Sequence, residues 1–263
     1  MSPKLLVASA AILAAVSAQA TVTVSSAAFT YSQNFNSLTT GGANSWVNDT
    51  TLTGWSLFNA PATPATAVTS YTVSTGTATA GAIYSYGLTS DADRALGSLA
   101  SGNVAATNLT MAVAFTNNSG LTLDSFTMRY DGEQWRNGGN TTAQKLTVQY
   151  GFGSTFDTVA SWTTAGAAFD VNSVVNTSTA AAVNGNVAGL SANRGGTIST
   201  AWAPGAVLWV RWNDVNDGGN DHGLAIDNVS FSVTAAAVPE PSTYAMLLAG
   251  LGAVGFIARR RRA

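Results

Sequence analysis

The chain has 263 residues, room for one β-rich domain of about 200 residues with short appendages. Only 9% of the residues are charged although 46% are hydrophobic, which disfavours long amphipathic helices with charged outer faces. Cysteine is absent, which excludes disulfides and thiolate metal sites, and residues 21–237 carry 6 Lys/Arg against 12 Asp/Glu, a net charge of −6 that makes nucleic acid a poor partner.

The N-terminus has the pattern of a secretory signal peptide. One positive charge, Lys4, precedes an apolar run over residues 5–16 and the small residues Ser17, Ala18 and Ala20. This order predicts a signal peptide over residues 1–20, cleaved after Ala20. The alternative is a short buried N-terminal helix.

The central part of the chain shows the two-residue periodicity of half-buried strands. Apolar residues alternate with small or polar ones over residues 82–86, 94–99, 109–115, 121–130, 146–152, 207–212 and 224–233. Gly/Asn-rich turns separate these segments. The pattern predicts one all-β domain over residues 21–237, an antiparallel two-sheet sandwich of the jelly-roll kind.

Three local predictions follow from this pattern. The turn at residues 117–120 lies between two strong strand segments and predicts a hairpin over residues 107–130. The alternation shifts at Asp227 and Asn228, which predicts a β-bulge there. Residues 171–193 have weak periodicity, and we expect a long connection without a regular element.

A first candidate ligand site is the polar and aromatic segment at residues 131–137. Glu133, Trp135 and Arg136 combine a carboxylate, an indole and a guanidinium, the groups that pack on and hydrogen-bond to sugar rings. In the alternative reading Glu133 pairs with Arg136 or Arg129 and Trp135 packs in the core. Asp131 and Glu133 resemble a glycosidase carboxylate pair, but a third carboxylate nearby is missing.

A second candidate site is the densest polar cluster of the chain. Asp214, Asn216, Asp217, Asp221 and Asp227 supply the hard oxygen ligands that calcium prefers, although their spacing is not that of an EF-hand. The alternative is a polar turn with Asx caps.

Other chemistry has little support in the sequence. His222, the one histidine, lies in a Gly/Asp-rich turn without a nucleophile elbow, and phosphate-binding loops and dinucleotide fingerprints are absent. Trp209 and Arg211 share one face of a strand and Trp212 the other, so these tryptophans are expected in the core. We therefore expect a non-catalytic protein.

The C-terminal tail, residues 238–263, has three distinct parts. Pro239, Glu240 and Pro241 precede an uncharged run over residues 243–258, and Arg259, Arg260, Arg261 and Arg262 follow at once. As a helix the run is about 24 Å long, somewhat less than a hydrocarbon core of about 30 Å. Snorkelling arginines and local thinning can cover the deficit, so we expect a transmembrane helix over residues 243–258. The arginines act as a membrane stop that stays in the cytoplasm, which leaves the domain outside.

This tripartite tail resembles the PEP-CTERM sorting signal of Gram-negative bacteria. The resemblance implies export, anchoring in the inner membrane with the ectodomain in the periplasm, cleavage near residues 239–241 by an exosortase-type transpeptidase, and later release or transfer to the cell surface. A permanent membrane anchor is the alternative.

Fragments of the domain, among them residues 33–38, 132–136 and 220–228, look like a jelly-roll ectodomain of exported bacterial proteins related in fold to laminin-G-like and carbohydrate-binding domains. Together the two resemblances imply a cell-envelope or matrix protein associated with exopolysaccharide, with calcium as its candidate structural ion. A purely structural surface protein and, less favoured, a glycoside-active enzyme are the alternatives.

Overall fold

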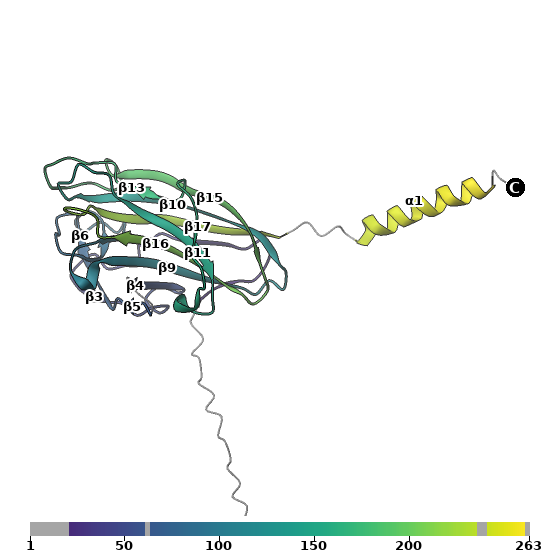
Figure 1. Ribbon diagram of the computed structural model, residues 1–263, viewed down its shortest axis with the longest axis horizontal. Coiled ribbons are helices and arrows are strands. Elements are labelled where there is room, and N and C mark those ends of the chain that lie inside the picture. The colour runs from purple at the N-terminus through teal and green to yellow at the C-terminus, as the bar shows by residue number, and fades with distance from the viewer. Residues whose placement is uncertain (1–20, 61–63, 236–240, 261–263) are drawn as a thin grey trace, which may run out of the picture.

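The computed structural model describes residues 21–60, 64–235 and 241–260 (Figure 1). The predicted signal peptide, Pro239, Glu240, Arg261 and Arg262 lie outside the described residues.

Residues 21–235 form an all-β sandwich of two sheets, as the periodicity predicts (Figure 1). The eight-stranded sheet has the order β12-β11-β16-β9-β4-β5, with β1 beside β9 and β13 beside β11. Its strands are β1 (Val22–Val24), β4 (Trp55–Asn59), β5 (Thr66–Ala67), β9 (Asn108–Asn117), β11 (Lys145–Phe152), β12 (Thr163–Thr164), β13 (Val171–Asn172) and β16 (Val207–Val215).

The nine-stranded sheet has the order β14-β10-β17-β8-β7-β6-β3, with β15 beside β10 and β2 beside β17. Its strands are β2 (Thr30–Gln33), β3 (Ala43–Ser45), β6 (Ser70–Ser74), β7 (Ala82–Tyr86), β8 (Ala95–Leu99), β10 (Leu123–Asn137), β14 (Ala181–Ala182), β15 (Leu190–Trp202) and β17 (Gly223–Ala235). The pairings β1–β9 and β6–β7 are parallel, so the predicted antiparallel arrangement holds for the other pairs only. Two 3₁₀ turns, η1 (Val104–Ala106) and η2 (Phe156–Thr158), lie in connections.

Aromatic side chains join the two sheets. Phe115 of β9 stacks on Phe231 of β17 with ring centroids 3.9 Å apart. Trp212 of β16 stacks on Trp55 and meets the ring of Tyr130 of β10 edge-on at 5.2 Å. These residues belong to one buried cluster between the sheets, which holds the domain without disulfides.

The predicted strands are confirmed, but the predicted hairpin over residues 107–130 is wrong. β9 lies in the eight-stranded sheet and β10 in the nine-stranded sheet, so the turn between them crosses from one sheet to the other. Asn117 fixes this crossing: its Nδ2 donates to the carbonyls of Leu121 and Trp202 at 2.9 Å, and its Oδ1 accepts from Ser119. A local turn signal does not reveal which sheet the next strand joins.

The predicted bulge is confirmed. Between Arg129 and Asp131 of β10 the partner strand β17 advances from Ser230 to Asp227, one residue more, and Asn228 has a positive φ of 51°.

The prediction of no regular element over residues 171–193 is wrong, because the short strands β13 and β14 lie within this range and β15 begins at Leu190. β15 pairs with β10 over most of its length. Most of its side chains are exposed or half-buried, so it lacks the apolar alternation by which a strand is recognised.

The tail forms helix α1 (Pro241–Arg260), which contains the predicted helical run at residues 243–258 (Figure 1, yellow). Among the described residues, no helix is both long and apolar enough to cross a membrane. Met246, Leu247, Leu248 and Leu251 of α1 are exposed, and the buried clusters of the protein lie wholly within residues 22–235.

We predict that Asn117→Ala destabilises the domain by about 1–3 kcal/mol, because the carbonyls of Leu121 and Trp202 then lose the amide that donates to them from a fully buried position. Urea unfolding of the two variants Asn117→Ala and Asn118→Ala measures this. Asn118 is exposed, and its replacement should cost less than about 0.5 kcal/mol. Equal effects of the two replacements would contradict the role given to Asn117.

Candidate functional site

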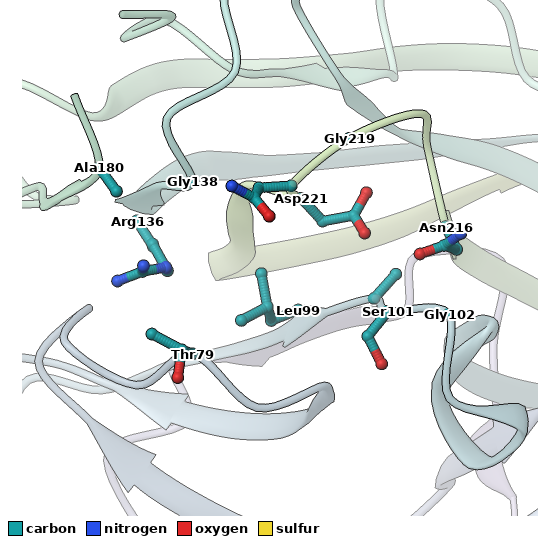
Figure 2. Close-up of a pocket in the computed structure, with 12 residues that line it drawn as sticks. Thr79, Leu99, Ser101, Gly102, Arg136, Gly138, Ala180, Asn216, Gly219 and Asp221 are labelled. Atoms are coloured by element: carbon teal, nitrogen blue, oxygen red, sulfur yellow. The ribbon is translucent and has the colours of Figure 1, made fainter. Parts of the chain in front are cut away.

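A pocket of about 360 Å³ opens at one end of the sandwich, where loops from both sheets meet (Figure 2). A volume of this size suits a small ligand, since pockets for small molecules start at roughly 300 Å³. The lining comes from residues 99–102 after β8, Arg136 and Gly138 at the end of β10, Asn216 and residues 219–221 after β16, and Thr79 and Ala180.

The pocket carries a positive side chain, Arg136 of β10, and a negative one, Asp221 in the loop after β16. Figure 2 shows Arg136 and Thr79 toward one end, and Asn216, Ser101 and the carboxylate of Asp221 toward the other. Among the described residues the one ion pair within 4.0 Å joins Lys145 to Asp170, so Arg136 and Asp221 are not paired with each other. A ligand can therefore meet both groups without first breaking a salt bridge.

Arg136 is half-buried and largely free to bind. Its Nη1 donates to the carbonyl of Gly76 at 3.3 Å, the one hydrogen bond of the guanidinium in the described structure. A guanidinium has five N–H donors, so most of its capacity faces other partners.

Asp221 is held by its own loop. Its Oδ1 accepts from the backbone N–H of Asp217 at 2.9 Å, and the side chain is 8% exposed. Burial raises the pKa of Asp221 to about 6, with the charge of Asp217 acting in the same direction and the hydrogen bond against it. At neutral pH Asp221 remains mainly a hydrogen-bond acceptor.

The loop at residues 216–221 is fixed to its neighbours by amide side chains. Asn140 donates through Nδ2 to the carbonyls of Gly218 and Asn220, and Gln144 donates through Nε2 to the Asn220 carbonyl. The backbone at Gly138 lies so close that an added Cβ would come 2.2 Å from the Asp221 carbonyl oxygen. The turn is therefore built by contacts from the connection between β10 and β11 as well as by its own residues.

Behind this loop lie two buried titratable groups. Asp214 accepts a 2.7 Å hydrogen bond from Ser98 Oγ, and burial raises its pKa to about 8. His222 Nδ1 accepts from the backbone N–H of Gly138 at 3.0 Å, and burial lowers the pKa of the imidazole. Neither group lines the pocket.

The first predicted ligand site is divided by the structure. Arg136 lines the pocket, whereas Glu133 and Trp135 are only 2% and 1% exposed. Trp135 Nε1 donates to Glu133 Oε2 at 2.6 Å, and its ring stacks parallel to that of Tyr86 with centroids 6.0 Å apart. Trp135 is thus a packing residue and not an open platform for a sugar ring.

The loop at residues 183–189 covers these two side chains. Val183 N donates to the Trp135 carbonyl at 2.8 Å, and Gln134 N donates to the Gly189 carbonyl at 2.9 Å. At Gly185 an added Cβ would lie 2.3 Å from Trp135 Nε1, so only glycine lets the loop approach the indole this closely. The loop closes the outer face of the nine-stranded sheet at this point.

Of the predicted carboxylate pair, Glu133 lies under the same cover and Asp131 is half-exposed. Burial raises the pKa of Glu133 to about 8, and the charges of Asp227, Asp93 and Asp131 act in the same direction. Asp131 is bonded to the Asn193 backbone and to the Asn228 side chain. A glycosidic bond cannot reach Glu133 while the 183–189 loop is in place.

The predicted calcium ligands lie in two places. Asn216 and Asp221 line the pocket, and Asp217 donates its N–H to Asp221. Asp227 lies opposite Asp131 in the pairing of β10 with β17, and burial and the charge of Asp93 both raise its pKa. The register of β8 and β17 places Asp227 on the other face of the sheet from Ser98 and Asp214. Asp227 therefore lies apart from the other predicted ligands. Among the described residues, no group of three or more His, Asp or Glu side chains could hold a metal ion.

Six of the seven tryptophans are buried, among them Trp46, Trp209 and Trp212. Trp162 is the half-exposed one, and the guanidinium of Arg211 lies 4.0 Å from the centre of its ring. Sequence reasoning did not select Trp162, since it follows β11 in a stretch without a strand pattern.

The pocket residues Thr79, Leu99, Ser101 and Ala180 were also missed. They lie in other segments of the chain than Arg136 and Asp221, and none of them belongs to a polar motif. No signal in the sequence joins them.

We predict that the domain loses stability as the pH rises from 6.5 to 8. The folded pKa values of Glu133 and Asp214, about 8, lie above those of unfolded carboxyls, about 4, so the folded state binds more protons in this window and ionisation favours unfolding. Each such proton contributes at most about 1.4 kcal/mol per pH unit. His222, whose pKa is lowered on folding below the value of 6.5 for an unfolded histidine, binds more protons in the unfolded state near pH 6.5 and adds an opposite slope that fades by about pH 7.5.

Denaturant unfolding at both pH values measures the effect in the wild type, in Asp214→Asn and in a control, Asp124→Asn, at an exposed position. Asp214→Asn should flatten the pH dependence and the control should leave it unchanged. Stability that is constant or rises over the window would contradict the role of the buried carboxyls.

Comparison with known proteins adds a result for the tail. The model of the PEP-CTERM protein-sorting motif matches residues 237–262, which confirms the predicted tail to within one residue at each end. No curated protein sequence matches the chain. Among solved structures, the CBM22-1 xylan-binding domain of Paenibacillus barcinonensis Xyn10C aligns with 81% of this chain and 99% of its own at 10% identity and a TM-score of 0.39, too distant to bear on the ligand. The chain therefore ends in a PEP-CTERM motif, the signal of an exported protein sorted by an exosortase.

Proposed function

We propose that this chain is a non-catalytic component of the cell envelope or extracellular matrix that associates with glycans through the pocket at the end of its sandwich. The sorting motif supports an extracytoplasmic destination. The observation that carries the glycan part is the pocket itself, which joins a guanidinium with unused donors, a carboxylate, two amides and two hydroxyl side chains around one small space.

These groups suit a polyhydroxylated ligand. Sugars present many hydroxyls that both donate and accept hydrogen bonds. Arg136 offers donors, Asp221 offers an acceptor, and the amide of Asn216 offers both. The apolar floor at Leu99 and Ala100 provides a surface for ring C–H groups. We therefore place glycan binding in this pocket and not at Trp135, where the sequence predicted it.

A purely structural protein without a ligand site is the second candidate. It is favoured by the burial of Trp46 and Trp135, because glycan-binding surfaces commonly expose aromatic rings. Trp162 alone among the tryptophans offers a half-exposed face, and it lies with Arg211 on the eight-stranded sheet.

The non-catalytic part of the proposal rests on access. Glu133, the strongest candidate acid, is covered by the 183–189 loop, and the residues that line the pocket include neither histidine nor a pair of carboxylates. Asp221 and a single hydroxyl such as that of Ser101 lack the base that would activate a nucleophile.

For the tail, we propose that the domain is held at the periplasmic face before an exosortase cleaves near residues 239–241, and then reaches the cell surface or the matrix. Prolines at 239 and 241 deny the backbone helical hydrogen bonds, which leaves an extended segment for a protease to bind.

We predict that replacing Pro239, Glu240 and Pro241 by alanine leaves the tail uncleaved in a host that carries an exosortase. Mass spectrometry of the C-terminal peptide checks this, with Ser242→Ala as the control that should be processed as in the wild type. A tail that stays intact in the wild type, with and without the exosortase, would establish a permanent anchor instead.

We predict that residues 21–237, which contain the buried clusters formed by the described residues, are retained on the host's own exopolysaccharide. Affinity electrophoresis with calcium and then with chelator measures the retention, and retention in both buffers is expected because Asp227 lies on the other face of the sheet from Asp214. Loss of retention in chelator would restore the calcium hypothesis. Free migration in both buffers would favour the structural protein.

A further inference from the structure

The pocket is strongly asymmetric in charge, and this bears on which glycan it takes. Arg136 lies toward one end and the carboxylate of Asp221 toward the other, with Leu99 between them (Figure 2). The two charged groups do not come within 4.0 Å of each other. A neutral sugar would leave the guanidinium without a charged partner in a half-buried place.

Arg136 favours a planar anion. Its guanidinium presents parallel N–H groups, which match the two oxygens of a carboxylate in a bidentate pair. Only Nη1 is engaged within the protein, by the Gly76 carbonyl. The remaining donors are therefore available for a ligand carboxylate.

Asp221 limits what else the ligand carries. Its Oδ1 already accepts from Asp217 N, and the carboxylate can accept further hydrogen bonds but cannot donate when ionised. Hydroxyl groups satisfy it, whereas a second anionic group nearby would be repelled. Asn216 at this end both donates and accepts.

Binding of an anion in the pocket requires a specific local interaction, because the net charge of the domain repels anions. The sandwich carries a net charge of −6, so no general attraction draws an acidic polymer to it. Any preference for an acidic ligand must come from a specific cation, and among the pocket residues that cation is Arg136.

We propose that the pocket recognises a uronic acid residue of an acidic polysaccharide, with the sugar carboxylate on Arg136, the ring over Leu99, and ring hydroxyls on Asp221 and Asn216. This inference rests on the proposed glycan association and names its ligand class. A carboxylate fits better than a phosphate or a sulfate because it is planar, and a doubly charged phosphate also meets Asp221.

The test compares ligands that differ in charge alone. Isothermal titration of residues 21–237 with oligogalacturonate and with its methyl ester, which has the same rings and linkages but no charge, measures the preference directly. We expect the acid to bind at least tenfold more tightly than the ester. An oligosaccharide of equal length whose charged groups are sulfate esters in place of carboxylates should bind as weakly as the ester.

Variants assign the preference to one side chain. Arg136→Gln should lower the affinity for the acid to that for the ester, and Arg136→Lys, which keeps the charge but not the planar fork, should lie between. The control Arg129→Gln removes the same charge from an exposed position and should change the affinity less than twofold. Unchanged melting temperatures would show that the variants fold.

The outcomes separate this inference from the proposed function. Equal binding of acid and ester overturns the uronate inference and leaves glycan association standing. Acid binding that survives in Arg136→Gln also overturns it, since the anion would then sit elsewhere. Binding of none of the oligosaccharides, together with no retention on the host exopolysaccharide, overturns both.

Discussion

The contact on which the structure depends is the stacking of aromatic rings between the two sheets. Phe115 with Phe231, and Trp212 with Tyr130, are buried and bring strands from opposite sheets together in a chain with no cysteine. Each large ring buries roughly 150–250 Å² of surface, which stabilises a domain without disulfides. Because the tryptophans serve this purpose, few aromatic faces remain on the surface for ligands.

The ends of the sandwich carry the polar chemistry. Strands that leave the core at β8, β10 and β16 continue into loops whose residues converge on one pocket. Asn140 and Gln144 hold the 216–221 loop by its carbonyls, and buried Asp214 and His222 lie behind it. Ionisation of such a buried group lowers the stability of the domain, so the stability depends on pH.

The same chain also keeps a second polar region closed. Glu133 and Trp135 lie beneath the 183–189 loop, whose approach at Gly185 leaves no space for a ligand on the indole. Part of the segment that resembled a sugar site is therefore a packed layer between the sheet and its own loop. Arg136, one residue further, escapes this cover because a register shift between Gln134 and Arg136 carries it to the pocket.

The sequence alone determined the sorting signal, the strands and the bulge at Asn228, because these depend on local order, apolar alternation and residue type. It did not reveal that β9 and β10 belong to different sheets, that β15 forms an edge, or that Arg136 and Asp221 line one pocket while Asp227 faces elsewhere. Those facts are decided by pairing between residues far apart in the chain. Only the tertiary structure brings such residues together, since a strand's pattern states which faces are apolar and not which partner covers them.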